Sequence, residues 1–558
     1  MVQKLSVEQK SWVDKTLDSM TLQECIGQVL MPHHPFQALQ TDFQAVMKSS
    51  TEDWLRLIDN IPLGGMCVRM PPSQELKAML GRIQSESKIP IIVGANVEPG
   101  ASIRAIGGRR DGQGPEAPDY AGTAPPMMGF GAADDPNLTY ETCRLIAEQR
   151  RSYGFHWTFA PVIDLNLNFR NPVTNVRSLG DDTDKVLQQA TEFIRGFQHG
   201  GLMAATAKHF PGDGTDERDQ HLLTTSNHLS LDEWWTSYGK IWKSVIDMGV
   251  NAVMVGHIAF PAYEQRYGGS EPSLPGTLSS KIQTELLREE LGFQGVIISD
   301  ASPMTGITSR VNPSDRAIEN IRAGADMCLL PETMTDFGLI EGAVRDGRLN
   351  EDRIRDSVKR ILEMKSRLSL HEDVFMSGDT EYTSAQSEQI VRAVAEKSIT
   401  ALRTQENRSV ALNGSESVLF VNVFVDAAFT TSNLDILAGA LQSEGCTVEQ
   451  LENPTDTQLQ ETLPNYDAVF VNICHIPMSG SFGQIGAGFS QSLWRILHLY
   501  HDRVTYTCFG TPYVMYEMPH VPNMLFAYGA SQSVQLAVAK VWLGKSDATG
   551  TLPVKEPR

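Results

Sequence analysis

One short segment concentrates the side chains that could do chemistry. Residues 208–221 read Lys-His-Phe-Pro-Gly-Asp-Gly-Thr-Asp-Glu-Arg-Asp-Gln-His, and they follow an apolar run, 202–206, that predicts a buried strand. The carboxyl ends of such strands are where α/β proteins place their reactive groups. Because ordering so many charges is costly without a polar ligand, the segment indicates acid–base chemistry or ligand binding. A solvated charged loop is the alternative.

Two aspartates end other apolar runs. Asp300 follows the run 295–299, where a carboxylate can act as a nucleophile or a base. Capping the next helix is the alternative for Asp300, because aspartate is favoured at helix N-termini. Asp164 ends the run 160–163 and is followed by several amides and by Arg177, a combination suited to binding adjacent hydroxyl groups.

Two further strand ends carry polar side chains. Asn96 and Glu98 end the run beginning at residue 91, with Arg104 just beyond, and His257 ends the run beginning at residue 252. If all these strands belong to one barrel, their carboxyl ends lie on one face. The side chains are then expected to converge on a single site.

The elements that must position these residues alternate along the first two-thirds of the chain. Apolar, β-rich runs predict strands at 65–70, 91–97, 157–165, 202–208, 252–258, 296–299 and 327–330. Amphipathic segments between them, such as 279–291 and 352–368, predict helices. Strand–helix alternation implies parallel strands with right-handed crossovers, so we expect a (β/α)8 TIM-type barrel over residues 1–368, with one strand still unidentified.

A second α/β region follows the barrel. We expect a linker and connecting helix over residues 369–406, the helix spanning 384–403, and a smaller doubly wound α/β sandwich domain over 407–558. Its strands are predicted at 418–425, 467–471, 503–509 and 524–527. Its helices are predicted at 434–441, 490–499 and 531–543.

Composition excludes several classes of protein. The 558 residues include 67 acidic and 47 basic side chains, a formal net charge of −20, which argues against binding nucleic acid or an anionic membrane. The seven cysteines are scattered without a Cys-x-x-Cys pair, so we expect buried thiols and no metal cluster. No apolar leader or membrane-length run is visible, and a cytoplasmic location is expected. The sequence leaves open whether the protein is a monomer or a homodimer.

The order of these motifs resembles the family 3 glycoside hydrolases, and within them the β-N-acetylglucosaminidase branch. The matching stretches are 160–164, 177–180, 208–212, 219–221 and 299–300 with Met304, and the likeness continues into the second domain at 527–529 and 550–554. The resemblance implies a retaining mechanism in which Asp300 is the nucleophile. It also implies that His221 is the acid/base, oriented by Asp219.

The chemistry of these residues agrees with the resemblance. Retaining hydrolysis needs one group that attacks the anomeric carbon and one that protonates the leaving oxygen. Cations near Asp300 would keep it ionised, and a histidine titrates near neutral pH with little tuning. We expect no metal or cofactor. The expected sugar-binding residues are Asn96, Glu98, Arg104, Asp164, Arg177, Lys208, His209, His257 and Met304.

The sequence therefore predicts a retaining exo-β-glycosidase, foremost a β-N-acetylglucosaminidase that removes terminal N-acetylglucosamine from small saccharides or cell-wall fragments. Two residues depart from the family pattern: Asn96 stands in place of a sugar-binding aspartate, and Asp213 in place of the usual histidine. β-Glucosidase or β-xylosidase specificity thus stays open. A phosphorylase is a further alternative, because a histidine acid does not repel phosphate. A non-catalytic carbohydrate-binding protein is the alternative of a different class.

Overall fold

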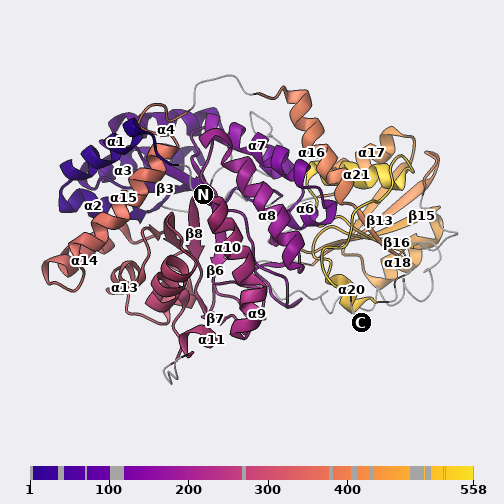
Figure 1. Ribbon diagram of the computed structural model, residues 1–558. Helices are drawn as coiled ribbons and strands as arrows, with labels where there is room; N and C mark the ends of the chain where they lie inside the picture. Colours follow the sequence, from indigo (N-terminus) through magenta and orange to yellow (C-terminus); the bar gives the residue numbers. More distant parts are fainter. Residues whose placement is uncertain are drawn as a thin grey trace.

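The chain forms two α/β bodies joined by a long helix (Figure 1). The computed structural model describes residues 4–34, 43–69, 72–100, 119–266, 272–375, 381–403, 411–425, 433–477, 496, 504–519, 521 and 523–556. Arg104 and the predicted helix 490–499, apart from residue 496, lie outside the described residues.

Parallel strands form a closed ring in the first body. The strands are β1 (Leu30–Met31), β2 (His33–His34), β3 (Gly65–Val68), β4 (Ile92–Ala95), β5 (Trp157–Thr158), β6 (Thr206–Phe210), β8 (Ala252–Val255), β10 (Val296–Ser299) and β11 (Cys328–Leu329). Neighbours pair in parallel, and single bridges at Trp157–Ala204 and Ile298–Met327 link the sheets. With β1 and β2 taken as one strand, the described residues form an eight-stranded barrel, which confirms the predicted fold class.

The first barrel strand is the one that the sequence did not reveal. Pro32 separates β1 from β2, and each piece is only two residues long. Proline has no N–H to donate to a neighbouring strand, so it interrupts the ladder and hides the strand in the sequence. Pairing of β1 with β11 and of β2 with β3 closes the ring.

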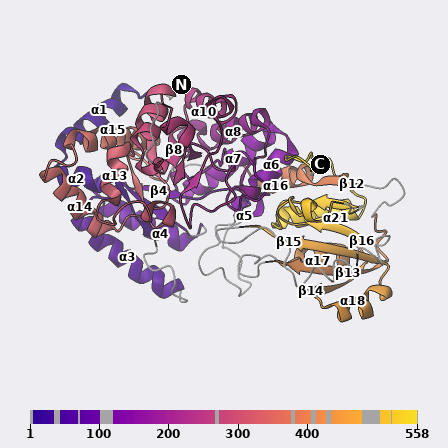
Figure 2. The ribbon, with the colours of Figure 1, turned by 90° about the horizontal axis from the view of Figure 1, so that it is seen from below.

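Helices surround the ring and bury its outer surface (Figures 1 and 2). The longer ones are α1 (Val7–Ser19), α2 (Leu22–Gln28), α3 (Phe43–Asn60), α4 (Gln74–Glu86), α7 (Pro136–Ser152), α8 (Thr183–Phe197), α10 (Tyr238–Met248), η4 (Lys281–Glu290), α13 (Arg316–Ala323), α14 (Thr333–Arg345) and α15 (Glu351–Arg367). Helix α15 illustrates why they form. Asn350 caps its N-terminus, and Ile354, Val358 and Ile361 bury one face, as predicted.

Shorter elements lie in the connections of the barrel. They are α5 (Tyr120–Thr123), α6 (Met127–Ala133), η1 (Asn175–Arg177), η2 (His199–Gly201), β7 (Thr225–Ser226), α9 (Leu231–Thr236), β9 (Ile258–Ala259), α11 (Pro261–Glu264), η3 (Gly276–Leu278) and α12 (Thr305–Thr308). Several of them follow the carboxyl ends of barrel strands, where the candidate site residues also lie.

A mixed sheet forms the second body. Its strand order is β12 (Thr400–Arg403), β17 (Met524–Phe526), β16 (Val504–Cys508), β15 (Ala468–Cys474), β13 (Ser417–Phe424) and β14 (Thr447–Glu452). All pairs are parallel except β12 with β17. The other elements are α16 (Ser384–Ser398), α17 (Asp435–Ser443), α18 (Asp456–Thr462), η5 (Leu463–Asn465), α20 (Val514–Glu517) and α21 (Gln532–Trp542). Alternate residues of β13 bury opposite faces of the sheet, as a sandwich requires.

Two predictions for this region need correction. The helix expected over 384–403 ends at Ser398, because the β-branched Ile399 and Thr400 leave the helix and residues 400–403 pair with β17. Strand β14 was not predicted, since it is an edge strand whose residues are half-buried or exposed.

The two bodies pack directly against each other. Met128 and Ala132 of α6 share a hydrophobic cluster with the second sheet. The C-terminal tail returns to the barrel, where Thr551 N–H donates to Ala132 C=O (2.9 Å) and Asp181 N–H donates to Pro553 C=O (3.1 Å). The second body thus supports the segment that carries Arg177. In the described part of the chain no helix is long and apolar enough to span a membrane.

Candidate active site

A buried ionic cluster joins Glu98, which follows β4, to Arg177, which lies in η1 after β5, and to Lys208 within β6. Both carboxylate oxygens of Glu98 accept from Arg177, at 2.9 Å from Nε and 2.8 Å from Nη2, and Oε1 also lies 2.6 Å from Lys208 Nζ. Burial would raise the pKa of Glu98, but the two cations outweigh it and lower that pKa strongly. Burial lowers the pKa of Lys208, against the effect of Glu98. The cluster holds two cationic side chains at fixed positions.

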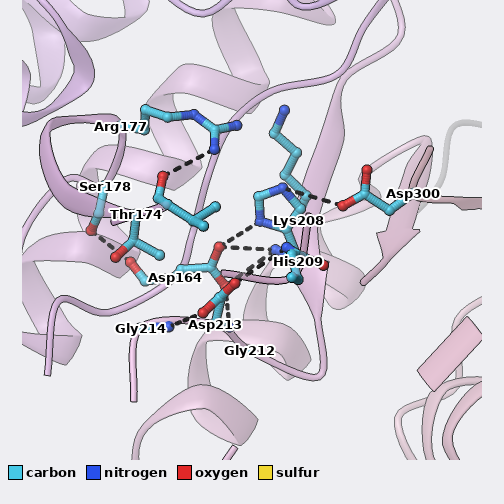
Figure 3. Close-up of polar contacts among 12 residues, drawn as sticks. Asp164, Thr174, Arg177, Ser178, Lys208, His209, Gly212, Asp213, Gly214 and Asp300 are labelled. Carbon is cyan, nitrogen blue, oxygen red and sulfur yellow. Dashed lines mark hydrogen bonds and ion pairs between the residues drawn. The ribbon is translucent and has the colours of Figure 1, made fainter. Parts of the chain in front are cut away.

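Asp164 and His209 form a second pair beside this cluster (Figure 3). The completely buried Asp164 carboxylate accepts from His209 Nδ1 at 2.7 Å, from the His209 N–H at 3.2 Å and from the Asp213 N–H at 2.7 Å. These contacts occupy the carboxylate, so the structure gives Asp164 the role of orienting His209. That differs from the predicted contact with the sugar.

Asp300 lies at the end of β10 and faces His209. Its Oδ2 lies 3.9 Å from His209 Nε2, and its Oδ1 accepts from the Ala301 N–H at 2.7 Å. Burial would raise the pKa of Asp300, but nearby imidazoles, His209 foremost, and the Ala301 N–H outweigh it and lower that pKa. The carboxylate is therefore ionised at neutral pH, as a nucleophile must be.

His221 and Asp219 form a hydrogen-bonded pair on the segment after β6. His221 Nδ1 lies 2.7 Å from Asp219 Oδ1, and the same oxygen accepts the His221 N–H at 2.8 Å. Because a carboxylate only accepts, the Nδ1 proton stays on the imidazole and Nε2 is the atom that can exchange a proton. The Asp219 side chain is 4% exposed and that of His221 37% exposed, so the carboxylate is buried while part of the ring is accessible to solvent. His221 is also near enough to Asp300 to lower its pKa.

The structure gives His257 a different place from the one predicted. Its ring is completely buried, with Nδ1 2.9 Å from Thr277 Oγ1 and Nε2 3.0 Å from the Ala301 carbonyl oxygen. Burial lowers the pKa of His257, which favours a neutral ring. Both ring nitrogens are thus occupied, and the ring holds the backbone just after Asp300. It leaves no nitrogen for a sugar.

The remaining predicted residues differ in exposure. Asn96 is exposed beyond β4 and accepts from Lys208 Nζ at 3.3 Å. Met304 is buried at the start of α12, four residues after Asp300. The site therefore brings together Asn96, Glu98, Arg177, Lys208 and His209 around Asp300. Arg104 is outside the described residues.

Sequence reasoning missed a polar network beneath the Asp219–His221 pair. Asp213, which is 2% exposed, accepts from Asn171 Nδ2 at 2.8 Å and from Gln220 Nε2 at 3.2 Å. Gln220 Oε1 in turn accepts the His257 N–H at 2.9 Å. The position of Gln220 between two candidate catalytic residues is the only sequence signal that could have drawn attention to it.

Replacing Glu98 by Gln should destabilise the protein by about 3–5 kcal/mol, because two buried cations lose their carboxylate. The pKa of Glu98 is lowered in the folded protein, so its contribution is present at neutral pH. That contribution declines as the pH falls below the ordinary glutamate value of about 4.3. Urea unfolding at pH 7 and at pH 4 measures both effects.

A matched control is Glu217→Gln, which removes an exposed carboxylate 3.4 Å from Arg170 in the same part of the barrel. It should change the free energy of unfolding by less than about 1 kcal/mol. Equal effects of the two substitutions would contradict a buried ionic role for Glu98.

The carboxyl group of Asp213 should make the stability of the protein depend on pH in the direction opposite to that of Glu98. Burial, together with the Asp164 carboxylate, raises the pKa of Asp213 to about 6. A raised pKa contributes stability below the ordinary aspartate value of about 3.9, and that stability is lost as the pH rises through 6. The difference in melting temperature between the wild type and Asp213→Asn should therefore shift against the wild type as the pH is raised from about 4 to about 7. A difference independent of pH would contradict the shifted pKa.

Groups that ligate metals do not cluster in the part of the chain that the structure describes. Within these residues no group of three histidine, cysteine or acidic side chains could hold a metal ion. All seven cysteines are buried and free, as expected for packed thiols. What the site offers is an ionised carboxylate, an oriented imidazole and two fixed cations.

Comparisons with known proteins find similarity along most of the chain. Residues 21–364 match the family model described as the glycosyl hydrolase family 3 N terminal domain. A β-N-acetylglucosaminidase/β-glucosidase of Cellulomonas fimi is 29% identical, over 98% of this chain and 95% of that protein.

Solved structures extend the similarity to both bodies. A family 3 β-N-acetylglucosaminidase from Paenibacillus sp. str. FPU-7 superposes with a TM-score of 0.81 at 28% identity, over 96% of this chain and 99% of that one. The β-glucoside phosphorylase BglX, bound to 2FGlc, superposes with a TM-score of 0.84 at 25% identity, over 99% and 97%.

Proposed function

The chain belongs to glycosyl hydrolase family 3, and on that basis we propose that it is a retaining exo-β-N-acetylglucosaminidase. The observation that carries the proposal is the placement of two groups: a buried, ionised Asp300 directly after β10, and a half-exposed His221 whose Nδ1 is held by Asp219 and whose carbonyl oxygen accepts the N–H of Thr305, five residues after Asp300. These are the two groups that retaining hydrolysis requires.

In the first step, Asp300 attacks the anomeric carbon and forms a covalent glycosyl-enzyme. His221 Nε2, protonated, gives its proton to the leaving oxygen, and Asp219 stabilises the imidazolium and fixes its tautomer. In the second step the neutral imidazole takes a proton from water, and the water oxygen displaces Asp300. Each group thus ends the cycle in its starting state.

The surrounding residues bind the sugar in this proposal. Lys208 within β6, Arg177 in η1 and the exposed Asn96 after β4 offer hydrogen-bond donors at fixed positions. His209, held by Asp164, presents Nε2 toward the same space. Catalysis then depends on placement of these groups before substrate arrives.

Hydrolysis of three paired aryl glycosides tests the proposal. We expect the kcat/KM for the aryl N-acetyl-β-glucosaminide to exceed those for the β-glucoside and the β-xyloside. The relative named as both a β-N-acetylglucosaminidase and a β-glucosidase supports including the glucoside. Turnover of none of the three would contradict the proposal.

A phosphorylase is the second candidate, favoured by the similarity to the β-glucoside phosphorylase over both bodies. An imidazole acid carries no negative charge to repel an incoming phosphate dianion. The same assays in inorganic phosphate separate the two activities. Sugar 1-phosphate as the main product would favour the phosphorylase, and free sugar at an unchanged rate would favour the hydrolase.

A further inference from the structure

Gln220 lies between the two residues of the proposed acid/base pair, yet its side chain is completely buried and points away from solvent. A buried amide needs partners for both its oxygen and its nitrogen. Gln220 has one for each: Oε1 accepts the His257 N–H at 2.9 Å, and Nε2 donates to Asp213 Oδ2 at 3.2 Å.

The backbone around Gln220 is held to a different part of the barrel. The Gln220 carbonyl oxygen accepts the Gly306 N–H at 3.2 Å, and the His221 carbonyl oxygen accepts the Thr305 N–H at 3.0 Å. The approach at Gly306 is close, since a Cβ there would lie 2.5 Å from the Gln220 oxygen. The segment is thereby tied to α12, which begins five residues after Asp300 in the connection that follows β10.

Gln220 therefore connects three strand ends. Its amide reaches His257 after β8 and Asp213 after β6, and its carbonyl reaches the connection after β10. His257 itself binds the Ala301 carbonyl beside Asp300. Two hydrogen-bonded routes thus join the segment carrying His221 to the backbone that carries Asp300.

We propose that Gln220 is a positioning residue that fixes the Asp219–His221 pair relative to Asp300. The inference rests on the proposed function of that pair. Proton transfer to a leaving oxygen requires His221 Nε2 within hydrogen-bond reach of it, and small misplacements reduce the rate strongly. An amide suits this place because an ionised glutamate would set a second carboxylate against Asp213.

The test uses Gln220→Ala and Gln220→Glu in the full-length protein, with Glu217→Gln as a control on the exposed part of the same segment. Hydrogen exchange of peptides covering residues 212–224, followed by mass spectrometry, measures how firmly the segment is held. We expect faster exchange there in Gln220→Ala and no change in the control. Unchanged exchange in Gln220→Ala would overturn the inference.

A series of aryl glycosides with increasingly poor leaving groups separates positioning from a general structural role. For Gln220→Ala we expect kcat/KM to fall about 10²-fold for a phenyl glycoside, which needs the acid, and only a few-fold for a dinitrophenyl glycoside. An equal loss across the series would show a merely structural role and overturn the inference.

Gln220→Glu adds a pH-dependent readout. A proton shared between the introduced carboxylate and Asp213 restores the missing donor at low pH, so the variant should resemble the wild type near pH 5. It should approach Gln220→Ala as the pH rises above 7. A profile parallel to that of the wild type would count against the inference. If the wild type hydrolyses none of the glycosides, the proposed function fails, while the exchange measurement still decides whether Gln220 holds the segment.

Discussion

Replacing Asp300 by Ala is expected to reduce kcat/KM for every aryl glycoside by about 10⁴-fold or more, the scale seen when a covalent nucleophile is removed. The carboxylate is the group poised to attack, because the nearby imidazoles and the Ala301 N–H keep its pKa low despite burial. Neither His209, 3.9 Å away, nor Asp164, occupied by three N–H groups, can replace it.

Azide should restore part of the lost turnover, since the cavity left by Asp300→Ala admits a small anion beside the anomeric carbon. The product should be a glycosyl azide of inverted configuration, identified by NMR. Asp326→Ala is not a suitable control, because that carboxylate is completely buried and pairs with Arg288. Asp247→Ala, an exposed substitution at a surface ion pair, is suitable. Loss of equal size in both variants would contradict a nucleophilic role for Asp300.

Replacing His221 by Ala is expected to lower kcat/KM about 10²–10⁴-fold for a phenyl glycoside and far less for a dinitrophenyl glycoside. A good leaving group departs without a proton, so the first step no longer depends on the acid. Within the described Asp219–His221 segment, the imidazole is the group that is both accessible to solvent and oriented by a carboxylate. The dependence of kcat/KM on the pKa of the leaving group, measured for the wild type and for His221→Ala, checks this role of the imidazole.

The same variant separates the two steps of the reaction. With dinitrophenyl substrates the glycosyl-enzyme forms quickly but is hydrolysed slowly, because the base that activates water is missing. A burst of dinitrophenol equal to the enzyme concentration should precede a slow steady state. Equal activity of His221→Ala and the wild type on the phenyl glycoside would rule out the acid role.

The sequence predicted the barrel and the site because both follow from local patterns. Apolar runs that end in polar residues identified seven strands and placed Asp300, Asp164 and Lys208 at their carboxyl ends. The eighth strand was missed because Pro32 divides it into two-residue pieces that no periodicity test detects. The edge strand β14 was missed because its residues are too exposed to form an apolar run.

The roles within the site depend on contacts between distant segments, which residue types alone do not specify. From the sequence His257 was predicted to bind the sugar, but its two ring nitrogens contact Thr277 and the carbonyl oxygen of Ala301. Asp164 was also predicted to bind the sugar, but its carboxylate accepts hydrogen bonds from three N–H groups. For Gln220 the sequence offered only its position between two candidate catalytic residues, and its contacts with Asp213 and His257 appear only in the folded chain.

The proposed mechanism depends on a covalent bond between Asp300 and the sugar, and peptide mass spectrometry detects this bond directly. His221→Ala, mixed with a dinitrophenyl N-acetyl-β-glucosaminide and quenched in acid during the steady state, should carry one sugar on the peptide that contains Asp300. A sugar on another carboxylate, or no adduct while dinitrophenol is released in a burst, would contradict it.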